Sequence, residues 1–219
     1  MRIKPPLPIF DSKKYIDENR DFSYLGDAYS LADIDASLAF LKSYQGSVGT
    51  FISYRREIER FIHWCAIYAK KPLSEIGRVD IENFIKFVHK PPKTWIGISK
   101  PAKFMTKAGL RVPNPKWRPF IATVSKQNNR DGESPDIDKF ALTTSSLKDL
   151  FSILSTFYAF LLRESYVTIN PVTLIRQKSS FIRNTQSSLK IRRLSDLQWQ
   201  YVIKTAKKLA ENEPENHER

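Results

Sequence analysis

Residues 143–170 read TTSSLKDLFSILSTFYAFLLRESYVTIN, and their pattern constrains how the other segments must pack. Large apolar side chains recur here at steps of three and four, which places them on one stripe of a helix. We expect Thr143 or Thr144 to cap the start of this helix and Asn170, followed by Pro171, to end it. Because the stripe cannot be buried by one helix, the sequence predicts a bundle. The stripe consists of Leu147, Leu150, Phe151, Leu154, Phe157, Tyr158, Leu161 and Leu162.

The opposite side of this predicted helix carries small or basic side chains, which suit the close approach of an anion. The chain as a whole is also basic, since 36 Lys and Arg against 23 Asp and Glu give a net charge of +13 over 219 residues. This excess indicates a polyanionic partner, most often nucleic acid and less often a membrane surface. A basic protein without such a partner is the alternative. The small or basic side chains are Ser145, Lys148, Ser152, Thr156 and Arg163.

The cysteine content and the hydropathy indicate the compartment. Cys65 is the single cysteine, which excludes an internal disulfide and is compatible with a reducing environment. The chain has no run of about 18 apolar residues, the length that a membrane-spanning helix needs. Its basic N-terminus has no apolar stretch typical of a secretory signal. We therefore expect a soluble, cytoplasmic protein that has no membrane partner.

Three further amphipathic helices are predicted upstream, over residues 31–44, 47–70 and 78–89. The second of them has one polar face that either contacts an anion or forms a solvated surface with local ion pairs. That face consists of Ser53, Arg56, Arg60 and His63, flanked by Arg55. The residues expected to be buried are Leu31, Ile34, Leu38 and Leu41 in the first helix, Phe51, Tyr54, Ile58, Phe61, Ile62, Cys65 and Ala69 in the second, and Val79, Ile81, Phe84, Ile85 and Val88 in the third.

Residues 91–140, which we call the insertion, differ in character from the predicted helices. No acidic residue occurs from Asn83 to Arg130, and several prolines prevent a continuous helix. Aromatic residues alternate with the basic ones, which is typical of a segment that lies along a phosphate backbone. The alternative is a flexible basic segment whose tryptophans pack onto the bundle. The basic residues of the acid-free stretch are Lys86, Lys90, Lys93, Lys100, Lys103, Lys107, Arg111, Lys116, Arg118, Lys126 and Arg130.

The chain ends with a polar segment and one more predicted helix. Residues 178–193 are rich in serine and free of acidic residues, as in a linker. Ser195 and Gln198 then form a capping box, and an apolar side follows from Trp199 to Leu209. We expect four parts: an N-terminal arm (1–30), a helical domain (31–177), the linker (178–193) and the beginning of a second domain (194–219).

The sequence contains no recognisable set of catalytic or metal-binding residues. His63 and Cys65 lie two positions apart and would point to different sides of one helix, so they lack the spacing of metal ligands. We expect His63 to lie at the surface or to face a nucleic acid, and Cys65 to lie in the core. The seven glycines are scattered, which leaves no phosphate-binding loop. We therefore expect no catalytic residue, no metal and no cofactor in this chain.

Three segments together resemble the tyrosine recombinases, also called phage integrases. Residues 50–88 (TFISYRREIERFIHWCAIYAKKPLSEIGRVDIENFIKFV) are similar to the family's helix, leucine tether and following helix. Residues 145–171 (SSLKDLFSILSTFYAFLLRESYVTINP) are similar to its helix that closes on Asn-Pro. Residues 192–206 (RRLSDLQWQYVIKTA) are similar to the entry into its catalytic domain. The resemblance implies an all-α, SAM-like bundle of four to five helices with a long basic insertion, a linker and one isolated helix.

The resemblance also implies a function and a set of contacts. The N-terminal domain of the family clamps duplex DNA at recombination sites, and a C-terminal tyrosine cleaves one strand without metal, nucleotide or small-molecule substrate. The Arg, HxxR and Tyr residues of that reaction are absent here, so this chain would supply DNA binding, association with the nucleoid and self-association on DNA. The implied DNA contacts are Thr50, Ser53, Arg56, Arg60, Ser145, Lys148, Ser152, Ser155, Lys190, Arg192 and Arg193.

The insertion is longer than the usual connection in that family, which leaves its role open between an additional DNA contact and a contact between protomers. To the candidate DNA contacts we add Arg55 and seven basic residues of the insertion: Lys93, Lys100, Lys103, Lys107, Arg111, Lys116 and Arg118. Two alternatives remain. One is a stand-alone nucleic-acid-binding or regulatory helical protein, and the other is a basic module that binds an acidic protein.

Overall fold

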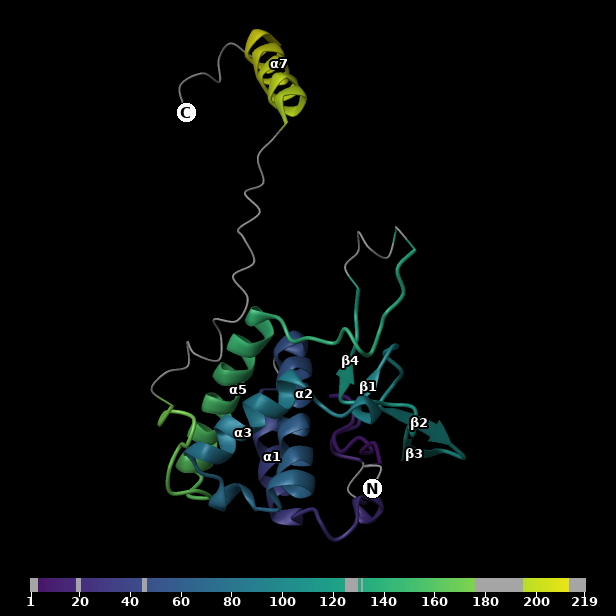
Figure 1. Cartoon of the computed structure of the whole chain (residues 1–219), viewed down its shortest axis with the longest axis vertical. Coiled ribbons are helices and arrows are strands. Elements are labelled where there is room, and N and C mark those ends of the chain that lie inside the picture. The colour runs from purple at the N-terminus through teal and green to yellow at the C-terminus, as the bar shows by residue number, and fades with distance from the viewer. Residues whose placement is uncertain are drawn as a thin grey trace. The chain divides into compact units, whose positions relative to one another are not determined.

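The computed structural model describes residues 4–18, 21–44, 47–124, 130, 132–175 and 195–212, with the backbone alone for 210–212. The chain divides into two compact units, residues 1–183 and residues 184–219. The first unit contains α1 (Leu31–Ser43), α2 (Val48–Trp64), α3 (Arg78–His89) and α5 (Thr144–Arg163), and the second contains α7 (Asp196–Asn212). Figure 1 shows the helices of the first unit gathered into a bundle, with the strands beside them.

Local sequence explains where these helices begin. The side chains of Ser30, Ser47 and Thr143 precede α1, α2 and α5, and each accepts a hydrogen bond from a backbone N–H of the first turn. At its C-terminal end α2 continues as a π-helix, η2 (Cys65–Ala69), which stops at Lys70 in a left-handed conformation. The short 3-10 helix η3 (Leu73–Glu75) then leads to α3.

The end of α5 differs from the sequence prediction. The helix was expected to reach Asn170, but it ends at Arg163 because Ser165 adopts a left-handed backbone conformation (φ 56°). The Tyr166 N–H turns back and donates to the Leu161 carbonyl at 2.9 Å. Asn170 caps a turn instead, since its side-chain oxygen accepts from the Val172 N–H at 3.1 Å.

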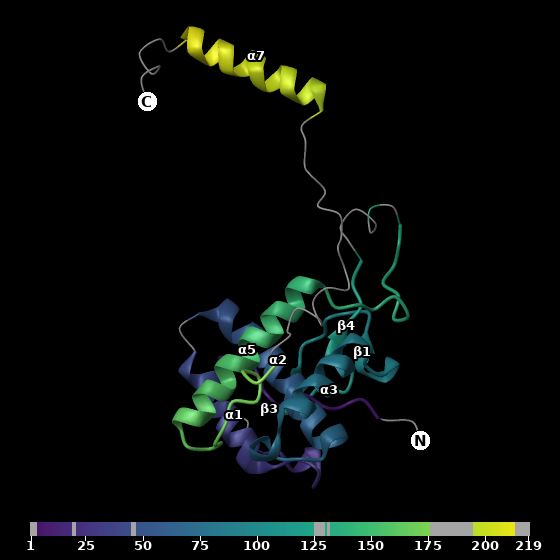
Figure 2. The ribbon, with the colours of Figure 1, turned by 60° about the vertical axis from the view of Figure 1, so that its left-hand side comes forward.

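The bundle buries the predicted stripe of α5 against α1 and α2 (Figure 2). Leu154 and Phe157 are fully buried, and Phe157 packs edge-on against Phe40 of α1 at 5.0 Å between ring centroids. Leu162 is the exception on the stripe, with 43% of its surface exposed. Two further predictions were wrong: Leu31 and Val79 are exposed. They occupy the first or second position of α1 and α3, where the neighbouring helices do not cover them.

The fold is mixed α and β, so the prediction of an all-α protein was wrong. The insertion forms two small sheets, one parallel pair and one antiparallel pair. β1 (Ile96–Gly97) pairs with β4 (Phe120–Ile121), and β2 (Phe104–Lys107) forms a hairpin with β3 (Leu110–Pro113). The prolines of the insertion prevent helices. Ala108 and Gly109 both have positive φ, which allows the tight turn that joins β2 to β3.

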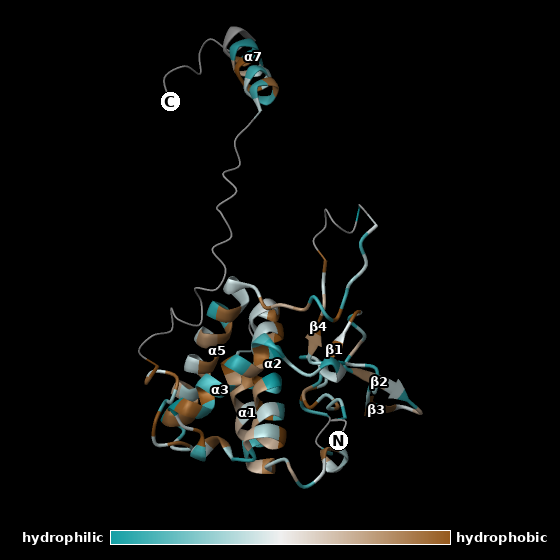
Figure 3. Cartoon of the chain, viewed as in Figure 1, coloured by the Kyte–Doolittle hydropathy of each residue, from teal (hydrophilic) through white to brown (hydrophobic). Residues whose placement is uncertain are grey.

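The N-terminal arm and the insertion form a second layer on the bundle. Ile9 and Phe10 of the arm are 1% exposed, and Trp95 and Phe120 of the insertion are fully buried. The structure therefore supports the interpretation in which the aromatic side chains of the insertion pack onto the bundle, as Trp95 does. β4 is hydrophobic, as its brown colour in Figure 3 shows, and its Phe120 is part of this buried layer.

The described part of the second unit is α7 with Ser195 before it. The predicted capping box is present: the Ser195 N–H donates to Gln198 Oε1 at 2.9 Å, and the Gln198 N–H donates to Ser195 Oγ at 3.3 Å. Every described side chain of this helix is exposed, including Trp199 and Leu197. Hydrophobic and hydrophilic residues alternate along it (Figure 3). In the part of the chain that is described, no helix is long and apolar enough to cross a membrane.

Candidate nucleic-acid interface

The polar face predicted for α2 divides into an exposed half and a covered half. Arg56 is exposed, and Thr50 and Ser53 are half-buried, in the first part of the helix. Further along, Arg60 is only 9% exposed and His63 is fully buried, because the arm and the insertion cover them. The expectation that His63 lies at the surface or faces a nucleic acid was therefore wrong. Cys65 is buried in the core, as predicted.

Glu59 is the centre of the covered half. Its carboxylate accepts hydrogen bonds from the Ile9 N–H at 2.7 Å and the Phe10 N–H at 3.1 Å, and it forms an ion pair with Lys103 of the insertion. Burial lowers the pKa of Lys103 to about 8, an effect that the neighbouring Glu59 carboxylate opposes. The ammonium also lies 4.9 Å from the centre of the Trp117 ring. Lys103 therefore joins the insertion to α2 and is not available to a phosphate.

A second carboxylate, Asp11 of the arm, connects the same three segments. Arg111 of the insertion binds it with two hydrogen bonds of 2.8 Å and lies over the Tyr15 ring at 4.5 Å. Arg55 of α2 donates to the Asp11 carbonyl at 2.7 Å. Two-point guanidinium–carboxylate contacts are among the stronger hydrogen bonds in proteins. Arg55 and Arg111 thus stabilise the contact between arm, insertion and helix.

The third connection is made by Arg60. Its guanidinium binds both Glu57 oxygens at 3.0 Å, donates to the Pro119 carbonyl at 2.8 Å and lies 4.4 Å above the Phe120 ring. All sides of the group are occupied by the protein itself. The predicted DNA contacts of Arg60 and Lys103 are therefore corrected to structural roles, because both side chains are buried in internal ion pairs.

The predicted polar side of α5 is open. Ser145, Lys148 and Ser152 are exposed, and Lys148 forms no ion pair in the described part of the chain. Ser155 is half-buried, and its carbonyl accepts from the Asn170 side chain at 3.0 Å. The short hydroxyl side chains leave room for a ligand to approach the helix backbone.

The insertion holds a mixture of engaged and unengaged cations. Lys93 pairs with Asp138, and Arg118 donates to the carbonyls of Pro115 and Trp117. In contrast, the exposed lysines of the acid-free stretch other than Lys93 form no ion pair within the described residues. They are Lys86, Lys90, Lys100, Lys107 and Lys116. The predicted contacts Lys190, Arg192 and Arg193 lie outside the described residues.

Sequence reasoning missed some of these residues. Lys86 and Lys90, at the end of α3, were not among the predicted contacts, although the acid-free run that begins at Asn83 was the signal for them. Asp11 and Glu59 were not recognised as the carboxylates that fix the insertion. No local pattern marks them, since their partners lie 100 and 44 residues away.

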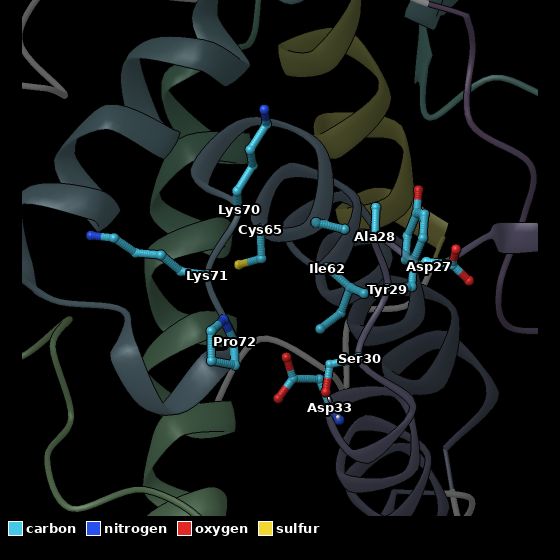
Figure 4. Close-up of a pocket in the computed structure, with 11 residues that line it drawn as sticks. Asp27, Ala28, Tyr29, Ser30, Asp33, Ile62, Cys65, Lys70, Lys71 and Pro72 are labelled. Atoms are coloured by element: carbon cyan, nitrogen blue, oxygen red, sulfur yellow. Dashed lines mark hydrogen bonds between the residues drawn. The ribbon is translucent and has the colours of Figure 1, made fainter.

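A cleft of about 410 Å³ lies beside η2, and its polar side chains are poorly suited to chemistry (Figure 4). Burial raises the pKa of the Cys65 thiol well above its usual range, so the reactive thiolate is disfavoured. Asp33 is already engaged, since it accepts from the Tyr166 hydroxyl at 2.6 Å and the Leu73 N–H at 3.1 Å. Among the described residues, no group of three or more His, Cys, Asp or Glu could hold a metal ion.

Comparisons with protein-family models, curated proteins and solved structures found no match for this chain.

Proposed function

We propose that this chain binds duplex DNA, as the DNA-holding module of a site-specific recombinase of the tyrosine type. The observation that carries the proposal is the distribution of paired and unpaired charge in the acid-free stretch from Asn83 to Arg130. Carboxylates from other segments neutralise Lys93, Lys103 and Arg111. The other exposed lysines of the stretch have no such partner in the described part of the chain.

An uncompensated set of lysines is costly to a folded protein, because like charges repel across a small surface. A polyanion relieves this repulsion and releases its own condensed counterions when it binds. Lys148 adds positive charge on α5, and α2, which packs against it, adds one further positive charge, because Arg56 and Arg60 share the single carboxylate of Glu57. The exposed Ser145 and Ser152 supply hydroxyl donors, which commonly bind phosphate oxygens.

The order of the segments supports the recombinase part of the proposal. A bundle in which α2, the η3 tether, α3 and α5 follow one another corresponds to the family pattern that residues 50–88 and 145–171 resemble. The covered half of α2 departs from that pattern, because Arg60 is withdrawn from the surface. We therefore assign the DNA contact to the exposed half of α2, to α5 and to the lysines of the insertion.

Titration of fluorescent duplex DNA at several salt concentrations tests DNA binding. We expect the logarithm of the binding constant to fall linearly with the logarithm of salt, with a slope of roughly −0.9 per phosphate contacted. Lys148→Ala should make this slope about 0.9 less steep and leave the melting temperature unchanged. Lys70→Asn is the matched control. It removes one exposed lysine at the C-terminal end of η2, away from the proposed contact at the start of α2, and should leave the salt slope unchanged. Asparagine tolerates the left-handed conformation of Lys70.

Two results would refute the proposal. Failure to bind duplex DNA at low salt would remove the function altogether, and binding that salt does not weaken would favour contacts other than phosphates. The recombinase part has a separate test. Footprinting on candidate attachment-site DNA should reveal a discrete protected site, whereas uniform protection of unrelated sequences would indicate a general DNA-binding protein.

A further inference from the structure

The hairpin of β2 and β3, residues 104–113, has a fixed base and a bare tip. At its base Phe104 is 2% exposed, and nearer the turn Arg111, the cross-strand partner of Thr106, is held by Asp11. Asn114 closes the base further, because its N–H donates to the Lys103 carbonyl at 2.8 Å and its side chain donates to the Ala102 carbonyl at 2.7 Å. Figure 1 shows the two strands directed away from the helices.

The tip is exposed over six consecutive residues, from Met105 to Leu110. Its turn is well defined: Ala108 has φ 49° and Gly109 has φ 78°, the signs required for the two-residue turn that matches the right-handed twist of paired strands. An exposed segment with a fixed base and an ordered turn can enter a concave surface at a small loss of conformational entropy.

The side chains of the tip combine positive charge with exposed apolar surface. Lys107 and Leu110 are cross-strand partners, as are Met105 and Val112, so alternation places these four side chains on one face of the ribbon. Leu110 is 70% exposed and Met105 is 41% exposed. Lys107 forms no ion pair within the described residues, and the surrounding stretch has no acidic residue.

A two-stranded ribbon has the dimensions of a DNA groove. Its strands lie about 4.8 Å apart, and the major groove of B-DNA, about 12 Å wide, accommodates such a ribbon. The thymine methyl group is the apolar feature that this groove presents. The positive charge of Lys107, with Lys100 and Lys116 elsewhere in the insertion, complements the phosphates on either side of the groove.

We propose that the tip of the hairpin, residues 105–110, enters the major groove of duplex DNA, with Lys107 at a phosphate and Leu110 against thymine methyl groups. This inference rests on the proposed DNA binding and adds the element and the groove that it reads. Positive charge around the tip favours DNA over a protein partner. A contact between protomers, which would use the same apolar side chains, is an outcome of the test.

The test compares the full chain with Leu110→Ser and Lys107→Gln on an A·T-rich duplex and on the same duplex with deoxyuridine in place of thymidine. Deoxyuridine lacks only the methyl group. We expect the wild-type protein to bind the deoxyuridine duplex about tenfold more weakly than the thymidine duplex. On the thymidine duplex, Leu110→Ser should bind about tenfold more weakly than the wild type. On the deoxyuridine duplex, the two proteins should have similar affinities. Lys107→Gln should weaken binding to both duplexes equally and make the salt slope less steep by about 0.9.

Ala108→Asn is the matched control, because Asn-Gly favours the same turn and should preserve affinity for both duplexes. If the wild-type protein binds duplex DNA and both tip variants bind it equally well, the hairpin proposal is wrong while the proposed function stands. If the wild-type protein does not bind duplex DNA, both fail. Equal DNA affinity with reduced self-association of Leu110→Ser in sedimentation would assign the tip to a protomer contact and overturn the groove assignment.

Discussion

Lys103 of the insertion forms an ion pair with Glu59 of α2, forty-four residues away in the sequence, and both side chains are withdrawn from solvent. The same carboxylate accepts the backbone N–H groups of Ile9 and Phe10. One side chain therefore connects the arm, the insertion and the bundle. Because the pair is largely desolvated, removal of one partner costs more than the pair contributes.

Glu59→Gln should destabilise the protein by about 3–5 kcal/mol, since it leaves the Lys103 ammonium buried without a counter-charge. Urea denaturation followed by circular dichroism measures the loss. Glu164→Gln, at an exposed carboxylate, is the control and should change the unfolding free energy by less than about 0.5 kcal/mol. The double variant Glu59→Gln/Lys103→Met should be more stable than Glu59→Gln alone. If Glu59→Gln were as stable as wild type, the ion pair with Lys103 would not be essential to the packing of the arm and the insertion on the bundle.

His63 should make stability depend on pH in the acidic range. Burial lowers the pKa of His63 from 6.5 to about 4, and its Nδ1 atom lies 2.8 Å from the Tyr29 hydroxyl. Between these two pH values the unfolded chain binds a proton that the folded chain rejects. The unfolding free energy therefore falls as pH falls through this window, by up to about 1.4 kcal/mol per pH unit, and the contribution is fully present above pH 6.5.

Urea denaturation of wild type and His63→Gln at several pH values across this window tests the prediction. The variant lacks the titrating group, so its unfolding free energy should change less steeply with pH. Carboxylates that do not interact with His63 titrate alike in both proteins and cancel in the comparison; Glu59, whose charge interacts with His63, belongs to the measured difference. Parallel curves for the two proteins would mean that His63 is protonated in the folded state.

Leu154→Ala should destabilise the bundle by about 2–5 kcal/mol, because Leu154 is fully buried on the stripe of α5 and its truncation leaves a cavity. Ser152→Ala, two residues earlier on the exposed side of the same helix, is the control and should be nearly neutral. Thermal denaturation of both variants measures the difference. Similar losses for the two would contradict the assignment of buried and exposed sides.

Ala108→Asn should stabilise the hairpin. Ala108 has φ 49°, a conformation in which alanine is strained and asparagine is better tolerated, and Asn-Gly is the preferred pair for this turn. Hydrogen exchange of the strand amides of Lys107 and Leu110, which flank the turn, should slow in the variant, while exchange in α5 remains unchanged. Faster exchange would show that the turn has a different geometry in solution.

The sequence alone determined the features that depend on neighbours a few residues apart. The buried stripe of α5 followed from steps of three and four, the limits of α3 were predicted to the residue, Ser195 was identified as a cap, and the cap of α5 was narrowed to Thr143 or Thr144, of which Thr143 is the one observed. These features need only local geometry: the helical repeat decides which side chains share a face, and a hydroxyl at a helix start binds the nearest free N–H groups.

Tertiary structure alone decided which polar residues face solvent. Arg56 and Arg60 occupy neighbouring turns of α2 and look alike in the sequence, but Pro119 and Phe120 cover only Arg60. The arm and the insertion bring Asp11 and Lys103 to this helix from distant positions, and the insertion pairs with itself in the strands that the all-α prediction lacked. Helical periodicity identifies the two faces of a helix. It does not say whether the polar face meets water, because that depends on charged partners whose position only the folded chain fixes.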